Sequence, residues 1–409
     1  MPRWALLFFT CSQASGILDT LLDNWGESLK TYLEFFAGAG MVRLALAPSW
    51  VCVFANDIDK KKTRAYKENF SSNGELVEAD IATVATERVP NGADLAWASF
   101  PCQDLSIAGK VEGLSGHRSS TFWEFWRVVR EKARLGVPLP LVVIENVVGL
   151  LYSKSGKDFA AIVHEFRKLR YAVGAFVVDA SLFVPQSRAR VFIVGVHESR
   201  DIPGHLISSV PELGPFYPRK LIDLVYTPKL ALQDCWVWWR LIAPNAPVCK
   251  LSDIVEWDTG EVPWHTKDQH SRLLSQLSPA HRKKVDALVA ARATAVLPIY
   301  RRTRQDDSGN KVQRAEARFD DKSGALRTPV GGSSRQLLLF IKGGRTKSRL
   351  LSPREAARLM GVPDSYRLPS NYNEAYHLIG DGVVVDVVSW INRHLFEPLL
   401  QNRSRSRVA

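Results

Sequence analysis

The stretch TYLEFFAGAG, residues 31–40, decides the fold of this chain of 409 residues. A short apolar run ends in small residues, a pattern typical of a strand that turns tightly into a helix beside a ligand. Arg43 stands where the dinucleotide-binding fingerprint has its third glycine, so a dinucleotide site is disfavoured. Such turns are also common as purely structural features, so the neighbouring segments must decide between the two.

Six more apolar runs predict strands at 51–55, 74–78, 94–99, 141–145, 171–178 and 191–196. Helix-like segments, such as 59–70 and 121–134, separate them. Near-continuous apolar strands between helices indicate an open α/β domain, whose parallel sheet is covered on both faces. Ligands of such sheets bind outside the carboxyl ends of the strands, so the residues there are the candidate site.

Acidic residues follow the second and third predicted strands. Asp57 ends the second strand, where an acidic side chain usually accepts hydrogen bonds from ribose hydroxyls. Asp80 and Ile81 follow the third strand. A Gly-rich loop and two acids at successive strand ends describe a nucleoside pocket without phosphate. This pattern predicts S-adenosylmethionine rather than NAD as the cofactor.

The fourth predicted strand leads to Cys102 in the sequence FPCQ, directly behind Pro101. Most free cysteines are half-buried structural thiols, and that is one interpretation of Cys102. The alternative is a nucleophile displayed at the carboxyl edge of the sheet.

The fifth strand delivers Glu145 and Asn146 to the same edge. A carboxylate that leaves an apolar strand must pair or take part in chemistry, because burying it unpaired is costly. Arg188 and Arg190 precede the last strand, and Arg190 should point into the cleft.

Charge and cysteine content narrow the class of protein. The five cysteines form no C-x-x-C pair, so neither a disulfide framework nor a metal site is predicted, and we expect an intracellular protein. No segment is long and apolar enough to span a membrane. Residues 265–350 hold 19 Lys and Arg against 7 Asp and Glu, which equals the net charge of +12 of the whole chain. Such a localised basic block indicates a polyanionic partner, most simply nucleic acid.

The ordered series FFAGAG, FPCQ, ENV, QSRAR, RLMGVPDSY and GDGV resembles the motif set of the DNA (cytosine-5) methyltransferases of bacterial type. The resemblance covers residues 31–196 and 349–395. It implies an α/β fold of the S-adenosylmethionine-dependent, Rossmann-like kind with a second, smaller target-recognition domain. The implied organisation is an N-terminal extension (1–30), a catalytic and cofactor-binding domain (31–200), the target-recognition domain (201–348), a return to the catalytic domain (349–400) and a basic tail (401–409).

The resemblance also implies roles for individual residues. Cys102 would be the nucleophile, Glu145 would contact N3 and the exocyclic amine of cytosine, Arg190 would hold O2, and Arg188 would help to position the loop and the substrate. The implied cofactor-binding residues are Phe36, Ala37, Gly38, Gly40, Asp57, Ile58, Asp80, Ile81, Pro101 and Asp381. The implied DNA-binding residues are Gln103, Ser106, Lys110, Arg118 and Arg335, of which Arg335 either reads a base or braces its loop against the large domain.

Two departures from the family pattern stand out. The last motif reads Gly380-Asp381-Gly382-Val383 instead of Gly-Asn-(Ala/Ser)-Val, and Met41 replaces a common glycine. The expected substrate is duplex DNA, with tRNA methylation and a catalytically silent DNA-binding protein as alternatives. By family habit we expect a monomer in the bacterial cytoplasm, with no metal and with a separately acting restriction endonuclease as a possible partner.

Overall fold

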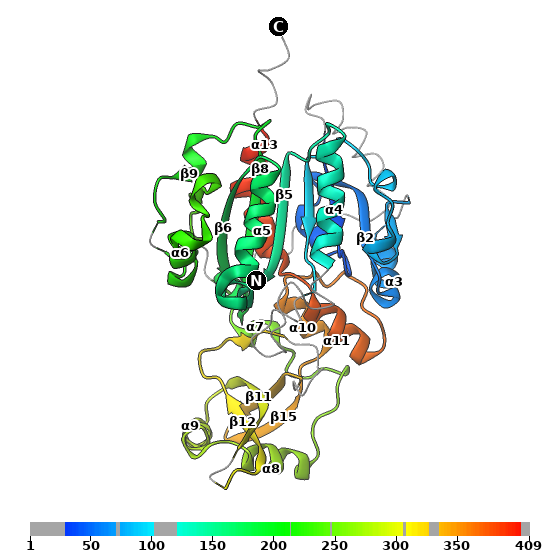
Figure 1. Cartoon of the computed structure of the whole chain (residues 1–409). Helices are drawn as coiled ribbons and strands as arrows, with labels where there is room; N and C mark the ends of the chain where they lie inside the picture. Colours follow the sequence, from blue (N-terminus) through cyan, green and yellow to red (C-terminus); the bar gives the residue numbers. More distant parts are fainter. Residues whose placement is uncertain are drawn as a thin grey trace.

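The computed structural model describes residues 29–70, 74–101, 121–212, 214–245, 248–305, 308–326 and 335–401. Its largest unit is a seven-stranded sheet in the order β3-β2-β1-β4-β5-β8-β6 (Figure 1). The strands are β1 (Lys30–Phe35), β2 (Trp50–Asp57), β3 (Leu76–Glu78), β4 (Leu95–Ala98), β5 (Leu141–Val147), β6 (Tyr171–Asp179) and β8 (Ala189–His197). Each of the seven predicted strands is therefore confirmed.

The direction of β8 differs from the expectation of a wholly parallel sheet. β8 pairs antiparallel with both β5 and β6, so that part of the prediction is wrong. The reason is the short connection 180–188 between β6 and β8. A parallel return needs a crossover of about a dozen residues or more, whereas an antiparallel return does not.

Helices cover both faces of the large sheet. Figure 1 shows α4 (Thr121–Arg134) and α5 (Lys157–Lys168) on one face and the C-terminal helices behind the other. There α12 (Val385–Ile391) packs against α2 (Met41–Leu46). Trp50 Nε1 donates to Asn392 Oδ1 at 2.8 Å. The C-terminal segment thus completes the large unit. Its other helices are α10 (Pro353–Leu359), α11 (Tyr372–Asp381) and α13 (Glu397–Leu400), and α3 (Lys60–Asn69) follows β2.

The Trp-rich segment 201–245 packs on the outer edge of β6. The Val237 amide donates to the Val173 carbonyl at 2.8 Å, and Trp239 is fully buried. Gly174 permits this approach, because a Cβ there would lie 2.4 Å from Trp239 Nε1. The segment, with β9 (Ile207–Ser208), α6 (Arg219–Val225) and β10 (Trp238–Trp239), shares the core of the large unit. This differs from the expected small domain over 201–348, and it covers an edge strand that would otherwise be open to pairing.

A second core belongs to a smaller unit, which lies below the large sheet in Figure 1. Its antiparallel sheet has the order β12-β11-β14-β15, with α8 (Lys267–Ser275) and α9 (Pro279–Ala290) beside it. Leu273, Val285 and Ile299 are among the buried side chains between helices and sheet. The strands are β11 (Ala295–Gln305), β12 (Lys311–Ala317), β14 (Leu337–Lys342) and β15 (Arg345–Leu350), and α7 (Leu251–Ile254) precedes the unit.

Backbone pairing and a buried ion pair are among the contacts that join the two units. β7 (Gln186–Ser187) pairs in parallel with β13 (Ser323–Gly324). Arg349 at the end of β15 pairs with Glu355 of α10, and both side chains are fully buried. Glu355 also completes a capping box with Ser352 at the start of α10. Within the described residues, no helix is long and apolar enough to cross a membrane.

Candidate active site

The carboxyl ends of four parallel strands meet at one edge of the large sheet. β1 pairs with β2 and β4, and β4 pairs with β5, all in parallel. β8 runs in the opposite direction, so its first residues lie at this same edge. This arrangement brings together the loop 36–40, Asp57, Pro101, Glu145 and Arg190, which come from widely separated parts of the sequence.

The loop 36–40 adopts the backbone that its sequence predicts. Gly38 and Gly40 have φ angles of 57° and 79°, and Phe36 has a φ of 60°, which is unusual for a residue with a side chain. A Cβ at Gly40 would lie 2.3 Å from the Phe70 ring, whereas a Cβ at Gly38 would meet no atom within 4 Å. Gly40 is therefore required by packing against α3. Gly38 faces open space, as a loop that lies against a ligand must.

Asp57 fixes this loop. Its carboxylate accepts hydrogen bonds from the amides of Gly38 and Asp59, each at 2.8 Å. Burial raises the pKa of the Asp57 carboxyl above its usual value, although nearby Lys62 lowers it. Because each carboxylate oxygen can accept more than one bond, the group can still accept from a ligand hydroxyl.

Two further residues complete this side of the site. Ile58 follows Asp57 and is 64% exposed, so the protein itself does not cover this apolar side chain. Asp80 accepts from the amide of Ala82 at 3.0 Å and begins the turn that contains buried Ile81. The arrangement offers an exposed apolar side chain next to two carboxylates.

Glu145 and Arg190 form an ion pair at the end of β5. Arg190 Nε lies 3.1 Å from Glu145 Oε1, and the two side chains are 18% and 10% exposed respectively. Val147 of β5 is directly opposite Arg190 in the sheet, so Glu145 is its diagonal neighbour on the same face. The pair is nearly buried but still reaches solvent. It satisfies the requirement that a carboxylate leaving an apolar strand be paired.

The chain enters the predicted nucleophile loop beside this ion pair. Asn146 Nδ2 donates to the carbonyl of Phe100 at 3.2 Å, a bond that ties the end of β4 to the end of β5. Pro101 is exposed at this edge. Cys102 lies outside the described residues, so its role stays a prediction. Asn146 nevertheless fixes the backbone two residues before it next to Glu145.

Arg188 has a different environment from Arg190. It is 4% exposed, and its guanidinium donates to the carbonyls of Leu326, Gly380 and Gly382 at 2.8–3.0 Å. These contacts join the large sheet to the chain that returns from the smaller unit and to the GDGV motif. Arg188 therefore positions backbone segments around the site, and its expected part in positioning the substrate stays a prediction.

Asp381 of the GDGV motif carries its own counter-charge. Its Oδ2 lies 2.9 Å from Lys62 Nζ of α3. The carboxylates of Asp381 and Asp57 both raise the pKa of Lys62, while burial lowers it, and the net direction is upward. Lys62 thus stands between the two predicted cofactor-binding acids. The sequence analysis did not single it out, because it is one of three consecutive lysines.

The two departures from the family pattern fit together. A Cβ at Gly382 would lie 2.1 Å from the Sδ of Met41. Met41 therefore occupies the space that an alanine or serine side chain at position 382 would need. The larger side chain at position 41 is accommodated because position 382 is a glycine.

Most of the predicted DNA-contacting residues lie in a part of the chain that the structure does not describe. Gln103, Ser106, Lys110 and Arg118 lie outside the described residues. Arg335 donates to Asn373 Oδ1 and lies over the ring of Tyr372, 5.2 Å from its centroid. Both partners belong to α11, so these contacts favour the bracing alternative for Arg335.

Gln186, the first residue of QSRAR, had no predicted role. It is fully buried and donates from Nε2 to the carbonyl of Leu359, while its Oε1 accepts from the amide of Leu326. The sequence signal that could have indicated this role was a polar side chain next to Pro185 at the start of a motif. Among the described residues, no group of His, Cys, Asp and Glu could hold a metal ion.

The sheet order, the single antiparallel strand, the Gly-rich loop and the acids at the strand ends define an α/β methyltransferase with a second, smaller unit. The family model of the C-5 cytosine-specific DNA methylases matches residues 30–397. This chain therefore belongs to that family and is a DNA cytosine-5-methyltransferase.

Individual relatives agree with this assignment. The type II methyltransferase M.HhaI of Haemophilus parahaemolyticus is 26% identical over 366 residues, which are 88% of this chain and 92% of the relative. M.HpaII of Haemophilus parainfluenzae is 26% identical over 389 residues, with 90% of each chain covered. The fold is similar to that of the methyltransferase EhMeth of Entamoeba histolytica, with a TM-score of 0.56, 14% identity and coverage of 91% and 99%. DNMT2 of Spodoptera frugiperda gives a TM-score of 0.55 at 18% identity, with 90% and 99% covered.

Proposed function

We propose that this enzyme transfers a methyl group from S-adenosylmethionine to C5 of a cytosine that has left the stack of duplex DNA, through a covalent bond between Cys102 and C6. The observation that supports this most directly is the Glu145–Arg190 pair, with 3.1 Å between Nε and Oε1, next to the backbone that leads into Cys102. A carboxyl and a guanidinium side by side match the amine edge and the carbonyl edge of one pyrimidine.

The described residues fit S-adenosylmethionine. Gly38 faces open space, Asp57 can accept bonds from ribose hydroxyls, and exposed Ile58 can cover an apolar face of adenine. When bound, the cofactor supplies an electrophilic methyl group on a sulfonium. Lys62 balances the charge of Asp381 beside this pocket, so the acids there do not repel one another.

The roles of the protein side chains follow from the chemistry of cytosine. C5 is a weak nucleophile, and addition of the Cys102 thiolate to C6 makes it enamine-like. The addition pushes negative charge from the C5–C6 bond into the rest of the ring. Glu145 shares a proton with N3, and Arg190 stabilises the charge at O2. C5 then attacks the sulfonium methyl group, whose C–S bond breaks to leave a neutral thioether. Loss of the C5 proton to a base and elimination of the thiolate restore the ring and the enzyme. A base inside a duplex cannot reach a sheet edge, so the cytosine must flip out at a cost of a few kcal/mol.

The first test is methyl transfer from labelled S-adenosylmethionine to duplex DNA and, separately, to tRNA. We expect label in DNA only. Label in tRNA alone would favour the alternative substrate, and no label in either would favour a silent DNA-binding protein.

The second test addresses the covalent step. We expect duplex DNA that contains 5-fluorocytosine to trap an adduct, because fluorine at C5 blocks elimination. Cys102→Ser should abolish both adduct and turnover while cofactor binding persists, since an alcohol is a far weaker nucleophile than a thiolate. Cys249→Ser, at an exposed cysteine outside the predicted site, is the control. Substantial turnover by Cys102→Ser would rule out the covalent route.

A further inference from the structure

An ion pair joins α3 to the end of α11 beside the predicted cofactor residues. Lys62 Nζ lies 2.9 Å from Asp381 Oδ2, and the two side chains are 24% and 40% exposed respectively. Asp381 stands where the family pattern has an uncharged asparagine, so an ion pair at this place depends on a departure of this chain from the pattern. The resemblance to the family assigned no role to Lys62.

The elements that this ion pair joins are also held together without it. Glu374 of α11 pairs with Lys61 at 2.9 Å and with Arg64 at 2.8 Å, and both of these partners belong to α3. The Lys61 side chain is 63% exposed, as is usual for a lysine on a helix surface. Lys62 is much less exposed, and burying an ammonium is costly unless it gains strong partners. A further link between α3 and α11 does not by itself explain this lysine.

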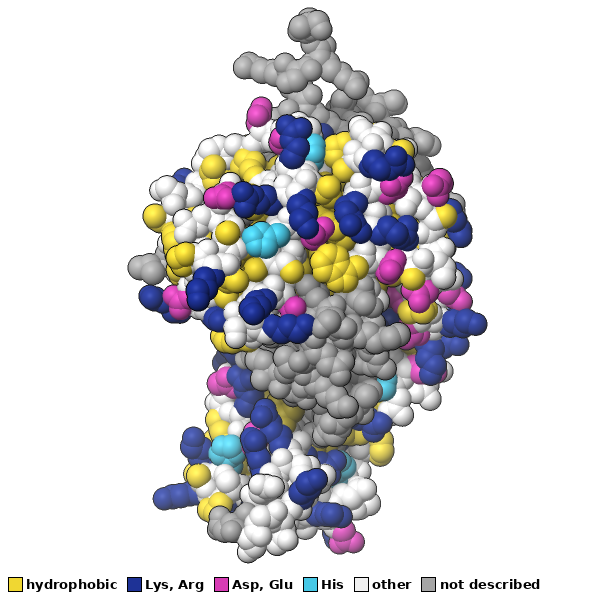
Figure 2. Space-filling model, in the orientation of Figure 1, with side chains coloured by type: hydrophobic (Ala, Val, Ile, Leu, Met, Phe, Trp, Pro, Cys, Tyr) yellow, Lys and Arg dark blue, Asp and Glu magenta, His cyan; other side chains and the backbone are white. Residues whose placement is uncertain are grey.

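The charges around α3 do not form a basic patch. On the right-hand flank of the large unit, where Figure 1 places α3, Figure 2 shows Lys and Arg side chains interspersed with Asp and Glu. Asp59 caps α3, and Glu374 and Asp381 belong to α11. These carboxylates repel a nucleic-acid phosphate. Lys62 therefore differs from the lysines of the basic segment 265–350 and suits a small ligand at the sheet edge.

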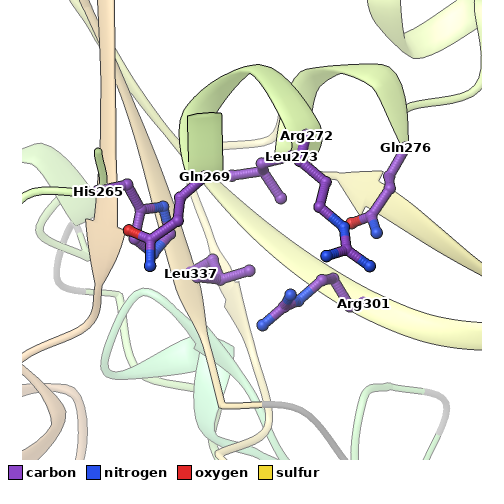
Figure 3. Close-up of a pocket in the computed structure, with 7 residues that line it drawn as sticks. All are labelled: His265, Gln269, Arg272, Leu273, Gln276, Arg301 and Leu337. Atoms are coloured by element: carbon purple, nitrogen blue, oxygen red, sulfur yellow. The ribbon is translucent and has the colours of Figure 1, made fainter. Parts of the chain in front are cut away.

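The cavity in Figure 3 belongs to another part of the molecule. It has a volume of about 240 Å³ and lies in the smaller unit, between α8 and its sheet. Its described lining includes Arg272 and Leu337 and none of the predicted cofactor-binding residues. The contacts to the cofactor must therefore come from the edge of the large sheet, where Asp57 lies.

Lys62 also acts on Asp57, the predicted acceptor of the ribose hydroxyls. Burial raises the pKa of the Asp57 carboxyl, and the positive charge of Lys62 opposes this effect. Burial lowers the pKa of Lys62, but Asp381 and Asp57 raise it, and the net direction is upward. Lys62 is therefore an ammonium at neutral pH, and its charge favours the ionised form of Asp57.

A ribose hydroxyl can use both an acceptor and a donor. An ionised carboxylate only accepts hydrogen bonds and an ammonium only donates them, whereas a hydroxyl does both. Asp57 accepts from the amides of Gly38 and Asp59, each at 2.8 Å, and its oxygens can accept further bonds. Lys62 has three N–H donors, so it can bond to Asp381 and still donate to a ligand oxygen. A carboxylate and an ammonium at one pocket match the two neighbouring hydroxyls of a ribose.

We propose that Lys62 donates a hydrogen bond to a ribose hydroxyl of the cofactor and that Asp381 positions the ammonium for this contact. The inference rests on the proposed function, because it takes S-adenosylmethionine as the cofactor. Asp57 and Lys62 then bind the same ribose, one as acceptor and the other as donor. Exposed Ile58, which follows Asp57, remains available for the adenine.

The first experiment measures binding of S-adenosylhomocysteine, the demethylated product of the cofactor, by calorimetric titration. Lys62→Met removes the charge and keeps the length of the side chain, and we expect about tenfold weaker binding. Lys61→Met is the matched control, because Lys61 also joins α3 to an acid of α11. The control should change the affinity by less than about twofold. Equal losses in both variants, or no loss in Lys62→Met, would overturn the proposal.

The second experiment separates Lys62 from its partner. Asp381→Asn restores the family residue and keeps an acceptor, so it leaves no unpaired acid when Lys62 is also replaced. We expect Lys62→Met/Asp381→Asn to bind the product about tenfold more weakly than Asp381→Asn alone. Equal affinities of these two proteins would mean that Lys62 only neutralises Asp381, which contradicts a contact with the ligand.

The positioning role of Asp381 is measured with Asp381→Ala, which lacks the acceptor. This change should weaken binding of the product when Lys62 is present and have much less effect in Lys62→Met, because the ammonium to be positioned is then absent. The same loss in both backgrounds would show that Asp381 acts on the ligand without Lys62.

The third experiment identifies the atom that Lys62 contacts. The titrations are repeated with the 2′-deoxy and 3′-deoxy forms of S-adenosylhomocysteine. The effect of Lys62→Met should shrink to about twofold or less with at least one of them, since the hydroxyl that accepts from Lys62 is missing. An effect that stays tenfold with both analogues would rule out the ribose.

These binding measurements do not require turnover, so the two proposals can fail separately. If the wild-type protein binds the product as expected but transfers no methyl group, the proposed function fails and the role of Lys62 stands. If the protein methylates DNA and Lys62→Met binds the product like the Lys61→Met control, only the role of Lys62 fails.

Discussion

The Asp57 carboxylate holds the loop 36–40 and is predicted to accept hydrogen bonds from the ribose hydroxyls of the cofactor. It therefore has both a structural and a ligand-binding role. We expect Asp57→Ala to weaken binding of S-adenosylmethionine by about 1–3 kcal/mol, because hydrogen bonds to a charged acceptor are lost. Calorimetric titration with the cofactor measures this. Binding of duplex DNA without cofactor should barely change, and an equal loss of both would show that Asp57 acts only through the fold.

Glu34 is a buried acid on β1 beneath the cofactor loop. It is 1% exposed, and its Oε2 has no hydrogen-bond partner among the described residues. Burial raises its pKa to about 8, against the opposing effect of Arg43. The folded protein therefore retains a proton that the unfolded chain loses near pH 4.5, so stability falls as the pH rises from about 4.5 to about 8.

Glu34→Gln removes this titration while keeping the shape. We expect the free energy of unfolding of the wild type, measured with urea and compared with that of Glu34→Gln, to be lower at pH 8 than at pH 5. Other titrating groups cancel in the comparison. A difference between the two proteins that stays constant with pH would contradict a protonated Glu34.

Single residues were predictable where the strand pattern fixed their place. Glu145 and Arg190 meet because the ends of β5 and β8 share one edge, and apolar runs locate those ends. Lys62 and Arg335 were not predictable in this way. Asp381, the partner of Lys62, is hundreds of residues away along the chain, and Asn373, the partner of Arg335, is tens of residues away. No local sequence pattern indicates such pairs.

At the scale of elements, α2 and the turn before α12 are fitted to one another through Met41 and Gly382. We expect Gly382→Ala to destabilise the protein by about 1–3 kcal/mol, because the new methyl group would lie 2.1 Å from Met41 Sδ. The backbone is not the reason, since Gly382 has a φ of −77°, which alanine adopts readily.

A second substitution separates packing from other causes. Met41→Ala alone should also be destabilising, because it leaves a cavity. The double variant should be more stable than the sum of the two losses predicts, and a double-mutant cycle from urea unfolding measures this coupling. Strict additivity would mean that the two departures from the family pattern are unrelated.

The order of the strands follows from topology more than from residue composition. Apolar runs located all seven strands of the large sheet, but the run of β8 reads like its parallel neighbours because it too is buried on both faces. The length of the connection 180–188 was the available signal for its direction. The placement of the Trp-rich segment 201–245 was missed for a different reason. Its side chains are buried against the edge of β6, but Pro and Trp break the periodicity that would have indicated this.

At the scale of the whole molecule, the chain has two cores, and Val296, Leu338 and Phe340 of the smaller sheet belong to the larger one. The basic segment 265–350 was visible from charge alone, and the smaller core lies within it. The boundary before it was not visible, because residues 201–245 lack strand or helix periodicity and their place depends on contacts with β6. Charge therefore located the second unit better than hydrophobic pattern did.

The ion pair Arg349–Glu355 joins β15 of the smaller unit to α10, and both side chains are fully buried. Glu355 also accepts from the amides of Glu256 and Ser352, each at 2.8 Å. Arg349→Met would leave a buried carboxylate without its charge partner. We expect a loss of about 3–5 kcal/mol in the free energy of unfolding.

The exposed pair Arg282–Asp286, whose side chains are 46% and 54% exposed, provides the matched control. Arg282→Met makes the same chemical change and should cost no more than about 1 kcal/mol. Both variants are unfolded in urea and followed by tryptophan fluorescence and by circular dichroism. If Arg349 joins the units, its variant should show two separated transitions, because the two cores then unfold independently. A single transition with a loss as small as that of Arg282→Met would mean that β7–β13 pairing and the Arg188 contacts hold the units together without this ion pair.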